Sequence, residues 1–386
     1  MGLEQNSRPL RIANIIEEGK LGGPQLRILA IAKELRHEVE TTVIMPRENS
    51  DSFRQKCEIA NIPYKVFSIS RITKELPVAF RYVFFSIFEV LLISKYIKRN
   101  KFDLVHVSGG SWQFKGVIAG RLAGVKVLWH LNDTCMPTII KKIFKLFSPL
   151  ASGIICSSYR TLDYYAPYFD NSLPLMVIYP PVNVSYFDPA VFISDVHPSR
   201  SRIIVGTLCN INPTKNIELI INVASCFKSR EEITFQIAGP VHKNQESYFL
   251  RLCNLIKKSK LTNIEFIGNV SDVRGYLSQL DIYFCSSLHE SGPMSLFEAM
   301  SMGKPIITTN VGDVSRYMLN DKIGYIIESV SDVKGAMKYI SKLSSNAELR
   351  SKLGSQSRKI ARNYFDVEKS STNHKNIYFQ ICRDYL

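Results

Sequence analysis

Short runs of hydrophobic residues recur along the chain and are separated by longer polar or amphipathic stretches. Such runs, rich in Ile and Val and bounded by glycine or polar residues, are typical of strands covered on both faces. Their alternation with helical stretches predicts parallel sheets, and hence an α/β fold. The expected strands of the first half are 11–16, 39–45, 64–68, 104–107, 125–128 and 153–156. Those of the second half are 203–206, 235–239, 264–268, 282–285 and 305–309.

A proline-rich run, Val177-Ile-Tyr-Pro-Pro-Val-Asn183, separates the two strand series and breaks regular structure. We therefore expect two domains, residues 1–185 and 186–370, and a C-terminal helix at 371–386.

The most informative segment is Glu290-Ser-Gly-Pro-Met-Ser-Leu-Phe-Glu298, which lies between two expected strands. Ser291 or Gly292 can cap a short helix, and Pro293 suits its first position. The preceding loop then lies beyond the carboxyl end of a parallel strand, where open α/β sheets bind ligands.

This helix start offers specific chemistry. The free N–H groups of Met294, Ser295 and Leu296 favour an anion such as a diphosphate. Glu298 is placed to accept hydrogen bonds from a ribose diol, and Glu290 from the hydroxyls of a sugar. The alternative is a capped surface helix with two solvated glutamates.

Composition limits the class of protein. The chain has 386 residues, of which 45% are hydrophobic and 22% charged, as in globular proteins. The eight cysteines form no Cys-x-x-Cys pair and no cluster with His at metal spacing, so we expect free thiols and no metal site. No secretory signal is visible, which favours a cytoplasmic location.

The surplus of positive charge is concentrated. Residues 65–145 hold fourteen Lys and Arg but four Asp and Glu, which accounts for ten of the fifteen surplus charges. This window contains two basic, apolar segments, 71–101 and 139–147. The apolar run of the first, residues 77–94, is shorter than a spanning helix and carries Arg81 and Glu89, so we expect that it does not span a membrane. Both can lie on an anionic membrane surface, or they can be core-packing helices with solvated basic ends. No nucleic-acid motif accompanies the charge, so we expect no nucleic-acid partner.

The segment from Glu290 to Glu298, followed by Ala-Met-x-x-Gly-Lys-Pro and then Val311-Gly312, resembles the signature of the retaining family 4 glycosyltransferases, also called glycosyl transferases group 1. The resemblance implies the GT-B fold: two Rossmann-like domains facing across a cleft, with the last helix crossing back to the first domain. In that family the first glutamate contacts the donor sugar and the second holds the nucleotide ribose.

The resemblance implies further roles. Adjacent Gly22 and Gly23 would lie near the donor phosphates, and His130 would touch the donor sugar and the acceptor region. Lys215 would pair with the diphosphate. Asn210 stands where the family has an arginine, and the loop at Val270 would touch the nucleotide base. Gly292 belongs to the same donor site.

The implied reaction is the metal-independent transfer of a hexose from a UDP- or GDP-sugar, without a cofactor. The acceptor would be a lipid-linked glycan of a bacterial surface polysaccharide such as lipopolysaccharide. Glu290, Lys215 and His130 would be catalytic. The chain contains no Asp-x-Asp, the metal-binding signature of the other large glycosyltransferase class. The resemblance places the enzyme in the cytoplasm, on the inner face of the plasma membrane. Two alternatives are a sugar-nucleotide 2-epimerase of similar architecture and a non-catalytic, nucleotide-sugar-binding subunit.

Overall fold

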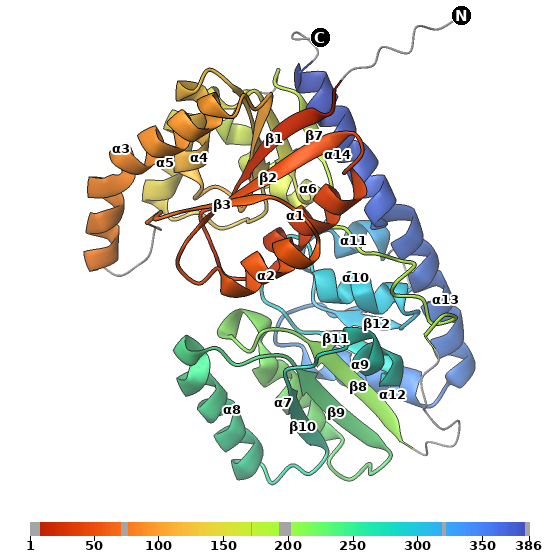
Figure 1. Ribbon diagram of the computed structural model, residues 1–386. Coiled ribbons are helices and arrows are strands. Elements are labelled where there is room, and N and C mark those ends of the chain that lie inside the picture. The colour runs from red at the N-terminus through yellow and green to blue at the C-terminus, as the bar shows by residue number, and fades with distance from the viewer. Residues whose placement is uncertain (1–7, 71–75, 171, 193–201, 319–321, 383–386) are drawn as a thin grey trace, which may run out of the picture. The chain divides into compact units, whose positions relative to one another are not determined.

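The computed structural model describes residues 8–70, 76–170, 172–192, 202–318 and 322–382 (Figure 1). The chain forms two compact units. Unit 1 comprises Met1–Pro181 and Val367–Leu386, and unit 2 comprises Val182–Asp366. The first division thus falls inside the proline-rich run, four residues before the expected boundary. The C-terminal segment of unit 1 begins at Val367, where we expected residue 371.

Unit 1 is built on a parallel sheet whose described strands follow the order β3-β2-β1-β4-β5-β6-β7. Strands β4 and β6 are buried along their whole length, as expected of strands covered on both faces. The edge strand β7 was not expected, because its three residues are only half-buried and merge with the proline-rich run. The strands are β1 (Leu10–Ile15), β2 (Val39–Pro46), β3 (Tyr64–Phe67), β4 (Leu104–Val107), β5 (Lys126–Leu131), β6 (Gly153–Cys156) and β7 (Leu175–Val177).

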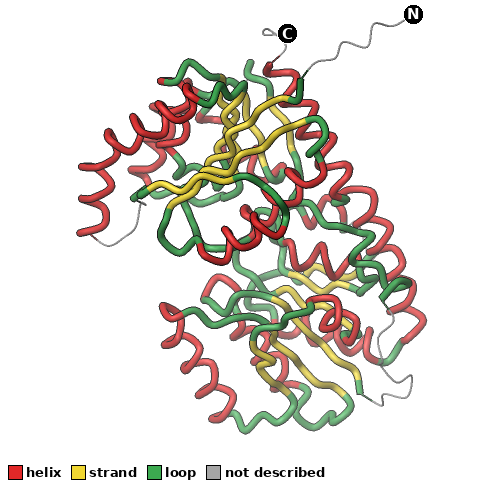
Figure 2. Tube along the Cα trace, viewed as in Figure 1, coloured by secondary structure: helices red, strands yellow, loops and turns green. Residues whose placement is uncertain are grey.

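Helices cover both faces of this sheet (Figure 2). Side chains alternate along each strand: Leu10 and Ile12 of β1 pack with α1 and α14, whereas Ala13 and Ile15 belong to the cluster that α3, α4 and α5 cover. The helices are α1 (Gly23–Glu34), α2 (Asp51–Ile59), α3 (Leu76–Arg99), α4 (Phe114–Leu122), α5 (Thr138–Phe147), α6 (Tyr159–Tyr165) and α14 (Val367–Cys382), with 3₁₀ turns η1 (Ser148–Leu150) and η2 (Ala166–Tyr168).

Glycine lets α4 approach the sheet closely. A Cβ added to Gly120 would lie 2.7 Å from Val127 Cγ2, and one added to Gly116 would lie 3.1 Å from Val107 Cγ2. At Gly120 the distance is shorter than real Cβ contacts, so a side chain there would force a shift, whereas at Gly116 the neighbouring side chain would have to give by a few tenths of an ångström.

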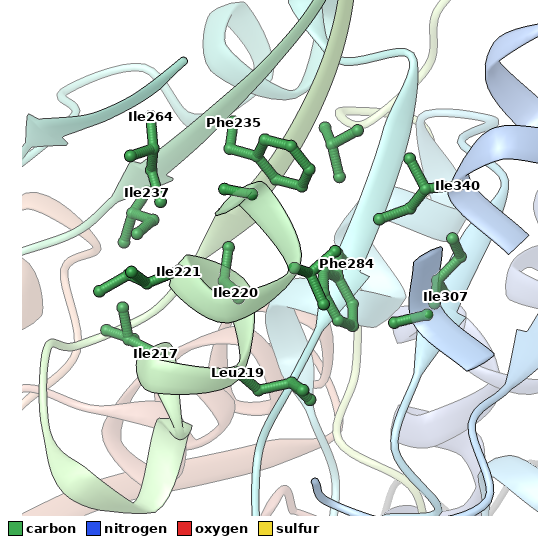
Figure 3. Close-up of a cluster of buried hydrophobic side chains, with 14 of the residues drawn as sticks. Ile217, Leu219, Ile220, Ile221, Phe235, Ile237, Ile264, Phe284, Ile307 and Ile340 are labelled. Carbon is green, nitrogen blue, oxygen red and sulfur yellow. The ribbon is translucent and has the colours of Figure 1, made fainter. Parts of the chain in front are cut away.

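Unit 2 is built on a second parallel sheet, whose described strands follow the order β10-β9-β8-β11-β12-β13. Its core joins Ile217, Ile220 and Ile221 of α7 to Phe235 and Phe284 on the strands (Figure 3). The strands are β8 (Ile203–Leu208), β9 (Ile233–Ala238), β10 (Ile264–Gly268), β11 (Ile282–Cys285), β12 (Ile306–Thr308) and β13 (Gly324–Ile326).

The helices of unit 2 include α10, which packs against α13 and contacts β11 and β12. Together with the two sheets, these helices confirm the expected α/β class with two Rossmann-like domains. The helices are α7 (Ile217–Cys226), α8 (Glu246–Lys258), α9 (Val273–Gln279), α10 (Met294–Ser301), α11 (Val314–Tyr317), α12 (Val333–Ser344) and α13 (Ala347–Tyr364), with 3₁₀ turns η3 (Pro213–Lys215) and η4 (Lys243–Gln245).

Candidate functional site

The strand order of unit 2 marks one position as a ligand site. From β8 the chain runs outward through β9 to β10, and then returns to place β11 on the other side of β8. Connections from β8 and β11 therefore leave in opposite directions. In open α/β sheets, ligands bind beyond the carboxyl ends of the two strands at such a reversal. Lys215 follows β8 and Glu290 follows β11, so the strand order brings both loops to this edge.

The two loops are joined by an ion pair. Lys215 Nζ donates a hydrogen bond to Glu290 Oε1, and the Ser287 hydroxyl donates to the same oxygen at 3.0 Å. The backbone is also connected, because the Ser286 hydroxyl donates to the Lys215 carbonyl at 2.7 Å and the Leu288 N–H donates to the Thr214 carbonyl at 2.8 Å. The lysine and glutamate are thus held in place by contacts on both sides.

The environment of Lys215 keeps its charge. Its side chain is 23% exposed and that of Glu290 is 16% exposed. Burial acts to lower the pKa of Lys215, but the Glu290 carboxylate outweighs it and, with the nearby thiols, raises the pKa above its ordinary value. Lys215 therefore keeps its ammonium charge beside Glu290, and both side chains can be reached from solvent.

A third loop, which contains Gly312, supports the backbone of Glu290. The Gly312 N–H donates to the Glu290 carbonyl at 2.9 Å, and Gly312 has a φ of 51°. A Cβ on this glycine would lie 2.9 Å from the Ser291 carbonyl oxygen. The glycine after Val311 is needed here because the two backbones touch in a left-handed conformation.

Helix α10 begins one residue later than expected. Pro293 is its N-cap instead of its first residue, and neither Ser291 nor Gly292 caps it. The Leu296 N–H already donates to the Pro293 carbonyl at 3.0 Å. The expectation of a free N–H at Leu296 is therefore wrong. Among the described residues, the backbone N–H groups of Met294 and Ser295 have no acceptor, as is normal for a first turn.

Glu298 lies on α10, one turn beyond those free N–H groups. Its side chain is half-buried, and burial raises the pKa of Glu298 to about 7. In the described part of the chain its carboxylate makes no hydrogen bond and no ion pair. A partly desolvated carboxylate without a partner is ready to accept hydrogen bonds from hydroxyl groups.

Asn210 and Val270 lie in loops at the same edge of the sheet. Asn210 is exposed, and its carbonyl accepts a hydrogen bond from the Asn212 amide at 3.2 Å. Val270 is half-buried in the loop after β10. No contact among the described residues joins either side chain to Lys215 or Glu290.

In unit 1, Gly22 and Gly23 lie where helix α1 begins. Gly22 is the N-cap and Gly23 the first helical residue. A Cβ on Gly22 would lie 3.4 Å from Gln25 Oε1. The loop follows β1, which flanks the reversal between β1 and β4 in this sheet.

His130 is enclosed by other side chains. It is fully buried, Arg27 Nη1 lies 2.9 Å from its Nε2, and His106 Nε2 lies 3.3 Å from its Nδ1. Burial first, and the Arg27 charge second, hold the pKa of His130 well below its ordinary value. Both ring nitrogens are occupied, so this ring touches a substrate only if it gives up a present partner.

Sequence reasoning did not find the partners of His130. Arg27 of α1 and His106 of β4 contact its ring nitrogens, and His374 of α14 stacks beside the ring. Tyr378 of α14 hydrogen-bonds to His106. The alternation of β4 held a signal for His106, because Leu104 two residues earlier faces the core under α1 and α14. For His374 and Tyr378 of α14, nothing in the local sequence indicated that they lie near this site.

One face of α3 is apolar and exposed. Its opposite face packs into the core through Ile93 and Ile97, and Glu89 forms a buried ion pair with Lys115. Residues 71–75 of the expected basic segment lie outside the described residues. The exposed residues recur at helical spacing and are 48–78% accessible: Phe84, Phe85, Ile87, Phe88, Leu91 and Leu92.

Helix α5 shows a smaller version of the same pattern. Ile140 and Phe144 are buried, whereas Ile139 is 67% exposed and Leu146 is 69% exposed. Each of the two segments therefore has a core-packing face and an exposed apolar part. No helix within the described ranges is long and apolar enough to cross a membrane.

Two family models match the chain in succession. Residues 21–186 match Glycosyltransferase Family 4, and residues 193–360 match Glycosyl transferases group 1. The chain belongs to the family 4-type GT-B glycosyltransferases. The two family models together cover both halves of this glycosyltransferase, which confirms the family and the fold that the sequence resemblance implied.

Curated relatives and solved structures agree with this membership. The glycosyltransferase is 21% identical to the O-antigen biosynthesis glycosyltransferase WclY of Escherichia coli, over 98% of this chain and 100% of that protein. It is 22% identical to the UDP-Gal:alpha-D-GlcNAc-diphosphoundecaprenol alpha-1,3-galactosyltransferase of Escherichia coli, over 76% of this chain and 79% of that one. The fold is similar to that of Anabaena Alr3699/HepE in complex with UDP, with a TM-score of 0.80, 18% identity, and coverage of 96% and 100%.

Proposed function

We propose that this glycosyltransferase moves a hexose from a UDP-sugar to a lipid-linked glycan with retention of anomeric configuration, in the synthesis of a surface polysaccharide. The observation that carries the proposal is the Lys215–Glu290 ion pair at the strand reversal of unit 2, beside the first turn of α10. This arrangement offers a cation for a diphosphate and two carboxylates for hydroxyl groups at one edge of a sheet.

The donor would be held by groups of different kinds. The diphosphate contacts Lys215 and the free N–H groups of Met294 and Ser295, because a cation and a helix N-terminus both favour anions. Glu298 accepts hydrogen bonds from the ribose diol. Glu290 accepts them from the hexose.

The remaining donor contacts are less specific. Gly292 and the loop at Val270 contact the donor through their backbones, Val270 at the base. Asn210 makes a neutral contact where the family has an arginine. Gly22 and Gly23 line the phosphates from unit 1.

The reaction needs charge stabilisation more than a nucleophile. The bond between the anomeric carbon and the diphosphate oxygen breaks, and a bond from that carbon to an acceptor hydroxyl oxygen forms. The hydroxyl proton passes to the leaving phosphate. Lys215 compensates the negative charge that develops on the diphosphate, so that no metal ion is required. The ion pair positions this ammonium before the donor arrives.

His130 is predicted to be catalytic, but its surroundings make it a weaker candidate than Lys215 and Glu290. For the ring to reach a substrate, it must exchange its hydrogen bond to Arg27 or His106 for one to the sugar. We expect a His130→Asn variant to lose turnover without losing donor affinity if the ring contacts the acceptor.

Two relatives support the choice of donor and acceptor. The Escherichia coli galactosyltransferase is named for UDP-Gal and for a diphosphoundecaprenol acceptor, and the HepE structure contains UDP. A UDP-sugar is therefore our proposal for this chain, and a GDP-sugar is the competing donor.

A lipid-linked acceptor requires access to a membrane surface. The exposed apolar face of α3 is followed by exposed Lys95, Lys98, Arg99 and Lys101, a combination that binds anionic lipid surfaces. We propose that α3, with the exposed end of α5, rests on the cytoplasmic side of an anionic membrane.

Flotation with vesicles tests the membrane contact. The protein should float with phosphatidylglycerol vesicles and not with phosphatidylcholine vesicles. Phe88→Glu on α3 should reduce flotation, whereas Ile59→Glu, at an even more exposed apolar residue on α2, should not. Equal flotation of the two variants removes α3 from the contact.

Transfer itself tests the proposed activity. A membrane extract with labelled UDP-sugars should give a labelled lipid product and free UDP, and NMR of the released glycan should show the donor's anomeric configuration. Conversion of the UDP-sugar into its 2-epimer without an acceptor would instead support the epimerase. Binding with neither product would support the non-catalytic subunit.

A further inference from the structure

A small cavity in unit 1 contains buried polar atoms without partners. It lies between α1, α14 and the strands β1, β2 and β4, and it has room for about one water-sized group. Three lining side chains leave an atom without a hydrogen bond: Arg27 Nη2, Asn14 Oδ1 and His374 Nε2. These three residues are 1–4% exposed. Buried polar groups are nearly always satisfied, so an occupant is expected.

The charge in this cavity is not balanced by protein. Arg27 is 3% exposed and makes no ion pair within the described part of the chain. Burial lowers the pKa of Arg27 to about 10, so its guanidinium remains charged at neutral pH. Its neighbours His106 and His374 are neutral, because burial holds the pKa of each well below the ordinary value. A buried, unpaired cation is costly, which favours a negative occupant.

The directions of the surrounding hydrogen bonds also favour a negatively charged occupant. Arginine can only donate, so Arg27 Nη1 donates to His130 Nε2, and the proton of neutral His130 must lie on Nδ1. That N–H donates to His106 Nε2, which places the His106 proton on Nδ1. His106 Nδ1 lies 2.8 Å from the Tyr378 hydroxyl oxygen and 3.3 Å from the Asn14 amide.

The position of the His106 proton also determines which neighbouring groups donate hydrogen bonds and which accept them. The Tyr378 hydroxyl accepts from His106 and keeps its own hydrogen to donate. The same N–H of His106 also faces the Asn14 amide at 3.3 Å, where an amide oxygen fits better than a second donor. The two ends of the amide have the same shape, and this orientation turns its N–H₂ toward the unpartnered position. Arg27, Asn14 and Tyr378, which all line the cavity, then each have a hydrogen to donate into it.

We propose that this cavity binds one small monatomic anion, such as chloride, through Arg27 Nη2, Asn14 Nδ2 and the Tyr378 hydroxyl. An anion accepts from all three groups and balances the guanidinium, and room for about one water-sized group favours a monatomic ion over phosphate or a carboxylate. The anion links α1 to α14, and hence the C-terminal segment to the start of unit 1. The competing occupant is a water molecule, which would donate to His374 Nε2. No donor-binding residue lines the cavity, and its Arg27 and His106 also hydrogen-bond to His130.

Bromide diffraction separates the two occupants. Crystals of the full chain grown with sodium bromide should show an anomalous peak within hydrogen-bond distance of Arg27 Nη2. An ordered water at that position, without anomalous signal and close to His374 Nε2, overturns the proposal. This measurement uses the unaltered protein, so it does not depend on how variants fold.

A halide-dependent thermal shift tests the same site in solution. Trp112 and Trp129, the only tryptophans of the chain, both lie in unit 1, so tryptophan fluorescence follows its unfolding. Replacing isethionate by chloride at constant ionic strength should raise its midpoint by about 3 °C. Lys33→Met, which removes an exposed cation from the same helix, should keep this shift, and Arg27→Met should lose it. An equal shift in the two variants, or none in the unaltered protein, contradicts the proposal.

Discussion

Replacing Glu298 by glutamine should stabilise unit 2 and weaken donor binding at the same time. Burial raises the pKa of Glu298 from 4.5 to about 7, which corresponds to about 3 kcal/mol of folding free energy above pH 7. The side chain is half-buried, so solvent reduces this to about 2 kcal/mol. A raised carboxylate pKa means that stability is complete below pH 4.5 and is lost as the pH rises through 7. Glutamine has no charge to desolvate and avoids this loss.

Calorimetry of the full chain measures this prediction. At pH 8 the unit 2 transition of Glu298→Gln should lie roughly 4–8 °C above that of the unaltered protein, and at pH 4.5 the two should coincide. Glu231→Gln, an exposed position beside the amino end of β9, is the matched control and should change neither. The same Glu298 variant should bind the UDP-sugar about 10-fold more weakly, because a carboxylate accepts stronger hydrogen bonds from the ribose than an amide does.

Two results would refute this reasoning. If Glu298→Gln destabilises unit 2 at pH 8, the carboxylate has a stabilising partner and is not held ready for a ligand. If stability rises but donor affinity is unchanged, Glu298 is desolvated for another reason and does not contact the donor.

The other predictions concern activity, packing and pH. Lys215→Ala and Glu290→Ala should each lower turnover on the order of 100-fold, measured as UDP release; near-normal release in either variant removes that residue from the site. Gly120→Ala should destabilise unit 1 by about 1–3 kcal/mol in urea unfolding followed by tryptophan fluorescence, because its Cβ would lie 2.7 Å from Val127 Cγ2; an unchanged midpoint would show that α4 can move away. Donor affinity should fall as the pH drops from 8 to 6, because Glu298 is then protonated, and this pH dependence should be absent in Glu298→Gln.

The strands could be predicted because their signal is local. The runs at 39–45, 104–107 and 153–156 lie in β2, β4 and β6 with nearly the same bounds. The position of Glu290 followed from the run at 282–285, because the residue after a parallel strand must lie at its carboxyl edge.

Contacts between distant segments could not be predicted in this way. The pairing of Lys215 with Glu290 depends on β8 lying next to β11, which the order of hydrophobic runs does not specify. The start of α10 was misplaced by one residue because Pro293 is compatible with both the N-cap and the first helical position.

His130 shows a further limit of the sequence signal. Its position near the end of β5 was predicted, but its burial depends on Arg27 of α1 and His374 of α14, which approach it from distant parts of the chain. The apolar length of α3 was equally visible in the sequence. Which of its faces packs on the sheet followed only from the structure, through Ile93 and Ile97.

Equilibrium titration of UDP-sugars into the protein tests the central claim most directly. The unaltered chain should bind a UDP-sugar saturably, and Lys215→Ala and Glu290→Ala should each weaken binding at least about 10-fold, since each loses a charge-assisted contact to the diphosphate or the hexose. Unchanged affinity in both variants would contradict the account, because the donor would then bind away from the carboxyl ends of β8 and β11.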